Sequence, residues 1–179
     1  MPLSERGIKQ MKQVSKYIKN NSIYNKLSAV YCSDLSRAVK SAEIIAEPHS
    51  INPIVIPSLR ERNFGIWEGM SFDEIREKYP REFAAWAGNP LKFSPMEGEN
   101  TLEVRERVIN AFDEIMGKHN EEHIVIVAHG GVNRIILCHI LGIPLENIFR
   151  IEQDYAALNI IEFWDKYPVV KLINGIING

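Results

Sequence analysis

The sequence has little of several features that assign a chain directly to a class of protein. Cysteine occurs only 2 times among 179 residues, and Cys32 and Cys138 both lie in apolar surroundings along the chain. This excludes a disulfide framework and predicts reduced thiols in a cytoplasmic protein. No apolar run approaches the roughly 20 residues of a membrane helix. The opening MPLSERGIKQ also lacks the apolar segment of a secretion signal, so we expect no membrane association.

Strong charge and the common nucleotide, hydrolase and metal motifs are missing too. The net charge of −2 is too small to recruit nucleic acid or an anionic membrane through a broad field. The absence of G-x-S-x-G, Walker A and G-x-G-x-x-G sequences argues against a serine-hydrolase elbow, a P-loop and a dinucleotide site. His119 and His123 do not form the H-E-x-x-H pattern of zinc proteases. We expect neither a metal nor a cofactor.

What the sequence does contain is an alternation of short apolar runs and amphipathic stretches. This pattern predicts an α/β fold, a three-layer sandwich with a mostly parallel sheet flanked by helices. Ile124 to Val127, which are β-branched and uninterrupted, read as a strand buried on both faces. The other expected elements are strands at 29–32 and 54–56, helices at 5–19, 36–46 and 101–117, and a hairpin of 157–164 with 169–173 at the sheet edge.

The chain reads as one domain over residues 1–179, in which residues 66–100 form an insertion that covers one end of the sheet. Aromatic residues gather in and beside this insertion. They either line a substrate pocket or pack the insertion's own small core. They are Trp67, Phe72, Phe83, Trp86 and Phe93.

Polar side chains follow each of the expected parallel strands. Arg37 follows 29–32, Glu61 follows 54–56, and His129 follows 124–127 directly before Gly130-Gly131. The carboxyl ends of parallel strands share one edge, where α/β proteins bind ligands. Arginine binds phosphate oxygens bidentately, histidine adds positive charge, and glutamate donates a proton to a leaving oxygen. Gly130 lets backbone N–H groups approach an anion at a helix N-terminus.

Each of these residues also has an ordinary structural explanation. His129 is equally suited to capping the following helix, Arg37 to a place on the surface, and Glu61 to an ion pair with Arg60 or Arg62. Their coincidence at one edge of the sheet favours a phosphate site, but the spacing alone names no reaction.

Five short blocks follow one another along the chain in a distinctive order. They are Leu3-Ser4-Glu5-Arg6-Gly7, Ser33-Asp34-Leu35-Ser36-Arg37-Ala38, Leu59-Arg60-Glu61, Gly65-Ile66-Trp67-Glu68-Gly69 and Ala128-His129-Gly130-Gly131. Together they resemble the histidine phosphatase superfamily, which has the phosphoglycerate-mutase-like fold. The resemblance covers essentially the whole chain, and the tail from Asp154 to Asn174 is most similar to the alpha-ribazole phosphatase branch of cobalamin synthesis.

The resemblance implies a phosphomonoester hydrolase that works through a phosphohistidine without a metal. Arg37 would bind phosphate, Glu61 would protonate the leaving group and then activate water, and His129 would bind phosphate and stabilise the transferring group. The expected partner is a small phosphorylated metabolite, with alpha-ribazole 5'-phosphate as the expected substrate. A phosphoglycerate mutase is the alternative enzyme, and a homodimer stays open.

The family's nucleophilic histidine has no counterpart here. It belongs to an Arg-His-Gly sequence after the first, central strand, and none of the 5 histidines of this chain follows an arginine. We therefore expect a fold that lacks its first central strand. Either the native protein carries that segment upstream, or this is a short form that binds phosphate ligands without turnover, or a folded remnant that binds none.

Overall fold

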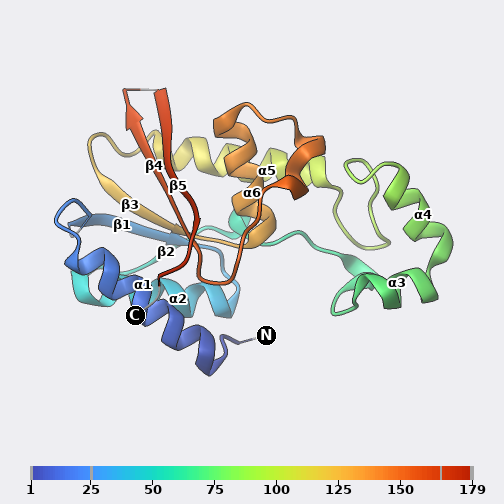
Figure 1. Cartoon of the computed structure of the whole chain (residues 1–179), viewed down its shortest axis with the longest axis horizontal. Helices are drawn as coiled ribbons and strands as arrows, with labels where there is room; N and C mark the ends of the chain where they lie inside the picture. Colours follow the sequence, from blue (N-terminus) through green and yellow to red (C-terminus); the bar gives the residue numbers. More distant parts are fainter. Residues whose placement is uncertain (1, 25, 166, 178–179) are drawn as a thin grey trace.

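The computed structural model describes residues 2–24, 26–165 and 167–177. Helices and strands alternate through most of this chain, and a β-hairpin follows them (Figure 1). The helices are α1 (Glu5–Asn20), α2 (Ser36–Ala46), α3 (Phe72–Lys78), α4 (Pro80–Gly88), α5 (Thr101–Met116) and α6 (Gly130–Leu141). The strands are β1 (Leu27–Cys32), β2 (Ile54–Val55), β3 (His123–Val127), β4 (Leu158–Trp164) and β5 (Tyr167–Gly175).

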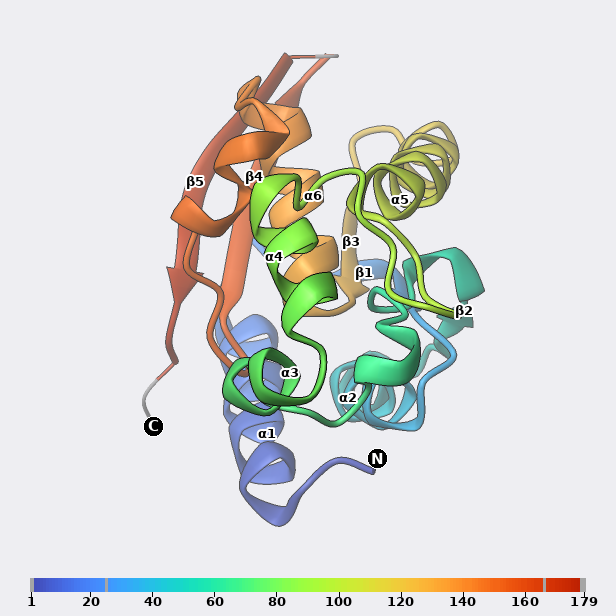
Figure 2. The ribbon, with the colours of Figure 1, turned by 90° about the vertical axis from the view of Figure 1, so that its right-hand side faces the viewer.

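The first three strands form a parallel sheet in the order β2-β1-β3. Tyr31 of β1 lies opposite Ile54 on one side and Ile126 on the other. Helices α1 and α2 cover one face of this sheet, and α5 and α6 cover the other (Figures 1 and 2). The predicted α/β sandwich with a parallel sheet between helices is confirmed.

Local sequence sets where the helices begin. Ser4 accepts a hydrogen bond from the Gly7 N–H (3.1 Å) and caps α1. Asn100 and Glu103 form a reciprocal capping box at the start of α5, as the sequence predicts. Because these caps satisfy N–H groups that have no partner inside the helix, both boundaries could be read from the sequence.

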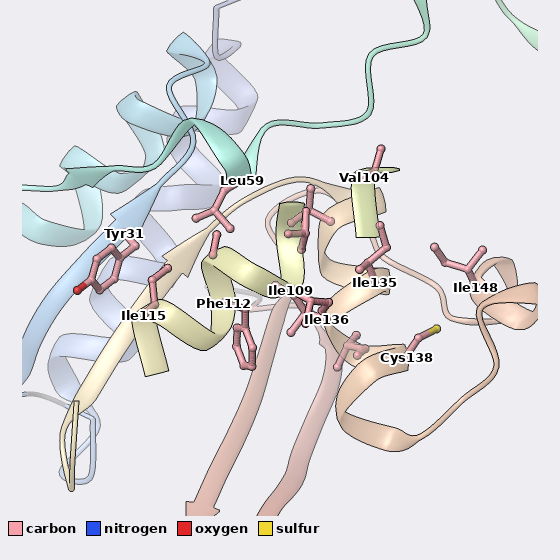
Figure 3. Close-up of a cluster of buried hydrophobic side chains, with 14 of the residues drawn as sticks. Tyr31, Leu59, Val104, Ile109, Phe112, Ile115, Ile135, Ile136, Cys138 and Ile148 are labelled. Atoms are coloured by element: carbon pink, nitrogen blue, oxygen red, sulfur yellow. The ribbon is translucent and has the colours of Figure 1, made fainter. Parts of the chain in front are cut away.

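The core lies on both faces of β1, because successive residues of a strand point to opposite sides. Ala29 and Tyr31 pack towards α5 and α6 in the cluster shown in Figure 3, whereas Val30 and Cys32 pack against α1 and α2. Cys32 and Cys138 are both free and buried. Burial raises the pKa of the Cys32 thiol to about 11, so it stays protonated at neutral pH.

Two expectations about the sheet are wrong. β3 is only partly buried, and the strand buried on both faces is its neighbour β1. The hairpin β4–β5 forms, but it is a separate antiparallel sheet that is not hydrogen-bonded to the parallel one. Both findings have one cause: β3 and β4 are not paired with each other, and a cavity lies between them. The sheet does not close over the position of the expected missing strand.

No helix within the described residues is long and apolar enough to span a membrane.

Candidate functional site

The site begins where β1 and β3 end side by side. The register pairs Cys32 with Val127, and the Ser33 N–H continues the ladder by donating to the Val127 carbonyl (3.3 Å). Ser33 is fully buried and His129 is 7% exposed. The Ser33 hydroxyl and the His129 imidazole Nε2 form a hydrogen bond of 2.7 Å. This contact fixes the orientation of the ring at the carboxyl edge of the sheet.

The surroundings of His129 disfavour its protonated form. Burial, followed by the positive charges of Arg37 and Arg107, lowers the pKa of His129 to about 4, against a smaller opposing effect of Asp34. The imidazole is therefore neutral at pH 7 in the free protein. Two guanidinium groups that act on one buried ring indicate a positive potential at this edge.

Arg37 lies in the first turn of α2, half-buried, as the sequence predicts. Within the described residues its guanidinium has neither an ion pair nor a hydrogen bond. The N-cap residues of α2 and α6, Leu35 and His129, make no side-chain capping hydrogen bond. The first N–H groups of a helix lack partners inside it and attract anions. An arginine that has no partner within the described residues, at the start of α2, suits an anionic ligand.

Glu61 reaches this edge from the segment after β2. Its Oε2 accepts the Gly131 N–H (3.0 Å), and its Oε1 accepts the Arg62 N–H (3.0 Å). A Cβ atom at Gly131 would lie 2.5 Å from Glu61 Oε1, so the glycine permits this approach. The second glycine of the Gly-Gly turn thus binds a carboxylate of the protein itself, while Gly130 occupies the first position of α6.

Glu61 does not form the ion pair with Arg60 or Arg62 that its sequence neighbours suggested. Arg60 instead makes a bidentate pair with Asp34 at 2.5 and 2.7 Å, and this hydrogen bond lowers the pKa of Asp34. Arg62 is buried and donates to the Phe93 and Glu99 carbonyls and to the Thr101 hydroxyl. Within the described residues the Glu61 carboxylate therefore makes no ion pair with the guanidinium of Arg60 or Arg62.

Arg107 of α5 holds the segment that carries Glu61, and the sequence analysis missed it. Its guanidinium donates to the Ser58, Arg60 and Glu61 carbonyls at 2.7, 2.8 and 3.3 Å. The same group makes a bidentate ion pair with Glu99 at 2.8 and 2.9 Å. One signal was present, because Arg107 stands three residues after the buried Val104 and four before the buried Ala111, and therefore shares their face of α5. Its carbonyl partners, however, are set by tertiary structure.

The 66–100 segment lies beyond the carboxyl ends of the parallel strands (Figure 1). Its aromatic residues pack among themselves, in agreement with the expectation that they form a small core of the segment. Trp67 stacks on Phe93 with 5.2 Å between ring centroids, and Phe72 stacks on Trp86 at 5.1 Å, with Phe83 beside them. A cavity of about 210 Å³ adjoins Trp67 and Phe72.

His119 has a structural place away from this edge. Its Nδ1 lies 2.6 Å from Glu122 Oε2, and its Nε2 lies 2.8 Å from the Tyr31 hydroxyl. His123 instead meets the Tyr24 ring edge-on.

Several proteins that this chain resembles in sequence are phosphatases. The chain is 30% identical to phosphoserine phosphatase 1 of Hydrogenobacter thermophilus over 172 residues, which cover 96% of this chain and 80% of that protein. It is 24% identical to the adenosylcobalamin/alpha-ribazole phosphatase of Escherichia coli over 173 residues, covering 97% of this chain and 83% of that one.

Solved structures show the same architecture. The alpha-ribazole phosphatase of Shigella flexneri matches with a TM-score of 0.87 at 24% identity, over 99% of this chain and 86% of that one. Bacillus stearothermophilus YhfR matches with a TM-score of 0.85 at 28% identity, over 98% and 85% of the two chains.

The fold and these relatives define the class: the chain is a phosphatase by family, and its relatives are hydrolases of phosphate esters. The model of the histidine phosphatase superfamily (branch 1) matches residues 1–175. The chain belongs to that superfamily.

Proposed function

We propose that the chain binds the phosphoryl group of a small phosphomonoester at the carboxyl ends of β1, β2 and β3, and that the residues there are the phosphate-binding and proton-transfer groups of a phosphomonoester hydrolase. One observation carries the proposal. The His129–Ser33 and Glu61–Gly131 hydrogen bonds join residues that are far apart in the sequence at a single place. Arg37, which has no partner among the described residues, acts electrostatically on the same imidazole.

The proposed roles follow from charge and hydrogen-bonding capacity. Arg37 and the Gly130 N–H bind phosphate oxygens. An incoming phosphate dianion favours the protonated form of His129, which then donates a charge-assisted hydrogen bond. In its carboxylic acid form Glu61 donates its proton to the leaving oxygen as the ester P–O bond breaks and the phosphoryl group passes to the attacking group. Its two backbone hydrogen bonds hold the carboxyl group in one orientation.

None of these proposed roles is the attack on the phosphorus atom. The resemblance assigns attack to a histidine in an Arg-His-Gly sequence, and this sequence contains none. We therefore propose that the 179-residue chain binds phosphate but hydrolyses phosphomonoesters only at the background rate. Purified activity that disappears in His129→Ala would contradict this, because it would place a nucleophile within the chain.

For the substrate we propose alpha-ribazole 5'-phosphate. Its aromatic base suits the exposed aromatic surface of the 66–100 segment, where Phe72 is 55% exposed and stacks on Trp86. Phosphoserine is the second candidate, because the Hydrogenobacter relative at 30% identity is a phosphoserine phosphatase. We propose that the segment acts as a lid that selects between such substrates.

The test is thermal unfolding in the presence of phosphate, vanadate and the two candidate substrates. A ligand at 100 times its Kd stabilises the native state by about 2.7 kcal/mol. Arg37→Met and His129→Gln should abolish the shift in Tm, whereas Arg105→Met, an exposed charge change on α5, should leave it intact. Equal shifts in all variants would refute the site. Exchange of phosphate between 2- and 3-phosphoglycerate would instead support the mutase alternative.

A further inference from the structure

A small cavity lies where the 66–100 segment begins, between the backbone around Phe64 and the start of α3 (Figure 1). Its volume is about 210 Å³. This is several times the roughly 30 Å³ that one water molecule takes up in the liquid, and less than the roughly 300–1,000 Å³ of a pocket for a drug-sized ligand. The cavity therefore suits a small molecule, or one end of a larger one.

Three aromatic residues belong to the lining of this cavity: Phe64, Trp67 and Phe72. Phe72 is 55% exposed, so much of its ring remains open to a ligand. The faces of aromatic rings carry a negative electrostatic potential that attracts cations, and groups of such rings bind alkylammonium ions. The composition of the lining thus favours a positively charged ligand with alkyl groups.

The charge at the cavity has the same preference. Glu68 alone is charged among the described residues of the lining. Its Oε1 accepts the Phe64 N–H (2.9 Å), and its Oε2 has no partner within the part of the chain that the structure describes. Arg62 lies over the Phe64 ring at 5.0 Å but is not part of the lining. Its positive charge is offset by nearby carboxylates, those of Glu61, Glu99 and Glu103.

The cavity suits neither an anion nor a metal ion. α3 begins beside it, but a capping box occupies the start of the helix. The Ser71 hydroxyl accepts the Glu74 N–H (3.3 Å), and Glu74 Oε2 accepts the Ser71 N–H (2.7 Å), so neither N–H is available to an anion. A metal ion needs several ligands, and no group of three metal-ligating side chains occurs among the described residues.

We propose that this cavity binds a small alkylammonium cation, with the aromatic rings against its alkyl groups and the Glu68 carboxylate near its nitrogen. Glu61 and Phe64 are three residues apart, so their Cα atoms are separated by at most about 11 Å. The cation can therefore be a free molecule or the far end of a phosphomonoester held at the candidate phosphate site. Only the second of these sources rests on the proposed function.

The probe is choline, measured by calorimetric titration and by NMR. The matched control is 3,3-dimethylbutan-1-ol, which has the shape of choline but a neutral carbon in place of the nitrogen. We expect saturable binding of choline and at least tenfold weaker binding of the alcohol. The changes in amide chemical shift should be confined to residues 64–75.

Phosphocholine distinguishes the two sources of the cation. If the cation is the far end of a phosphomonoester, phosphocholine binds at least tenfold more tightly than choline. Arg37→Met then removes this gain and leaves the binding of choline unchanged. If the cation is a free molecule, phosphocholine binds no more tightly than choline. A failure of the phosphate site would therefore leave choline binding intact.

Variants of the chain test the same cavity. Glu68→Gln removes the charge but keeps an acceptor for the Phe64 N–H, and Glu77→Gln removes the same charge from an exposed position of α3 outside the lining. Phe72→Leu removes a ring of the lining, whereas Phe83→Leu alters a ring that contacts Phe72 outside it. Choline binding should weaken at least tenfold in Glu68→Gln and at least threefold in Phe72→Leu, and should stay unchanged in both controls.

Absence of saturable binding at millimolar choline would overturn the proposal. Equal binding of choline and the neutral alcohol would also overturn it, because apolar adhesion would then account for the affinity without a role for charge. A Glu68→Gln variant that binds choline as the parent does would place the cation elsewhere on the chain.

Discussion

Replacing Arg107 with methionine tests how the candidate proton donor is held in place. The guanidinium makes five hydrogen bonds, two to the Glu99 carboxylate and three to carbonyls of residues 58, 60 and 61. Methionine keeps the unbranched apolar stem of the side chain and removes all of these hydrogen bonds. The Glu99 carboxylate then keeps its hydrogen bond from the Asn63 N–H. The three carbonyl groups lose their donor and have only water as a partner.

The expected loss follows from the exposure of the pair. The Arg107 and Glu99 side chains are 23% and 27% exposed, so solvent screens the pair in part. Buried charged hydrogen bonds each contribute about 1.5–3 kcal/mol and exposed ion pairs about 0–1 kcal/mol. Because the five bonds share one group and are not additive, we expect Arg107→Met to cost about 3 kcal/mol in total. For a domain of this size, this corresponds to a fall in Tm of roughly 6–12 °C.

The assay is urea unfolding of Arg107→Met and of Arg105→Met, which removes the same charge from an exposed position of α5. The control should stay within about 0.5 kcal/mol of the parent. Imidazole titration by NMR adds a second readout, because Arg107 helps to lower the pKa of His129. That pKa should rise in Arg107→Met and stay unchanged in the control. Equal free energies of unfolding in the two variants, or an unchanged pKa of His129 in Arg107→Met, would refute the proposed role of Arg107 in holding the segment that carries Glu61.

Two further changes probe the same edge of the sheet. Gly131→Ala places a Cβ atom 2.5 Å from Glu61 Oε1, and the shift it forces should cost about 1–3 kcal/mol in urea unfolding; Gly88→Ala, whose Cβ would meet nothing within 4 Å, is the control. The unfolded chain protonates His129 near pH 6.5, whereas the folded protein does so near pH 4, so stability should fall as the pH drops through this window. The loss should be at most about 3 kcal/mol and absent in His129→Gln, and parallel pH profiles of the two proteins would contradict it.

The sequence predicted most helices and strands because their signals are local. The Asn100–Glu103 box and the Ser4 cap need only neighbouring residues, and the β-branched runs mark the strands. The partial burial of β3 could not be read in this way. Ile124 to Val127 carry the composition of a fully buried strand, but burial depends on what lies beside the strand. Here a cavity lies there instead of a paired strand.

The same difference between local signals and tertiary contacts applies to the candidate site. Arg37, Glu61 and His129 could be found because each follows a recognisable strand and the ends of parallel strands meet. Ser33 and Arg107 were missed because their roles depend on partners 96 and up to 49 residues away. Hydrogen bonds to backbone carbonyls leave no trace in the residue types of the acceptors.

The two ends of the 66–100 segment close on each other. The Ile66 N–H donates to the Met96 carbonyl (3.1 Å), and the Glu99 N–H donates to the Asn63 carbonyl (2.8 Å). Gly65 and Gly98 permit these two backbone segments to approach so closely, since a Cβ atom at Gly65 would lie 2.0 Å from the Met96 carbonyl oxygen. The segment therefore leaves the sheet and returns through a single narrow neck. A different sequence grafted between residues 68 and 88 would leave this neck and the Phe93 carbonyl that binds Arg62 in place, so we expect such a replacement to change the proposed lid without moving the proposed phosphate-binding edge.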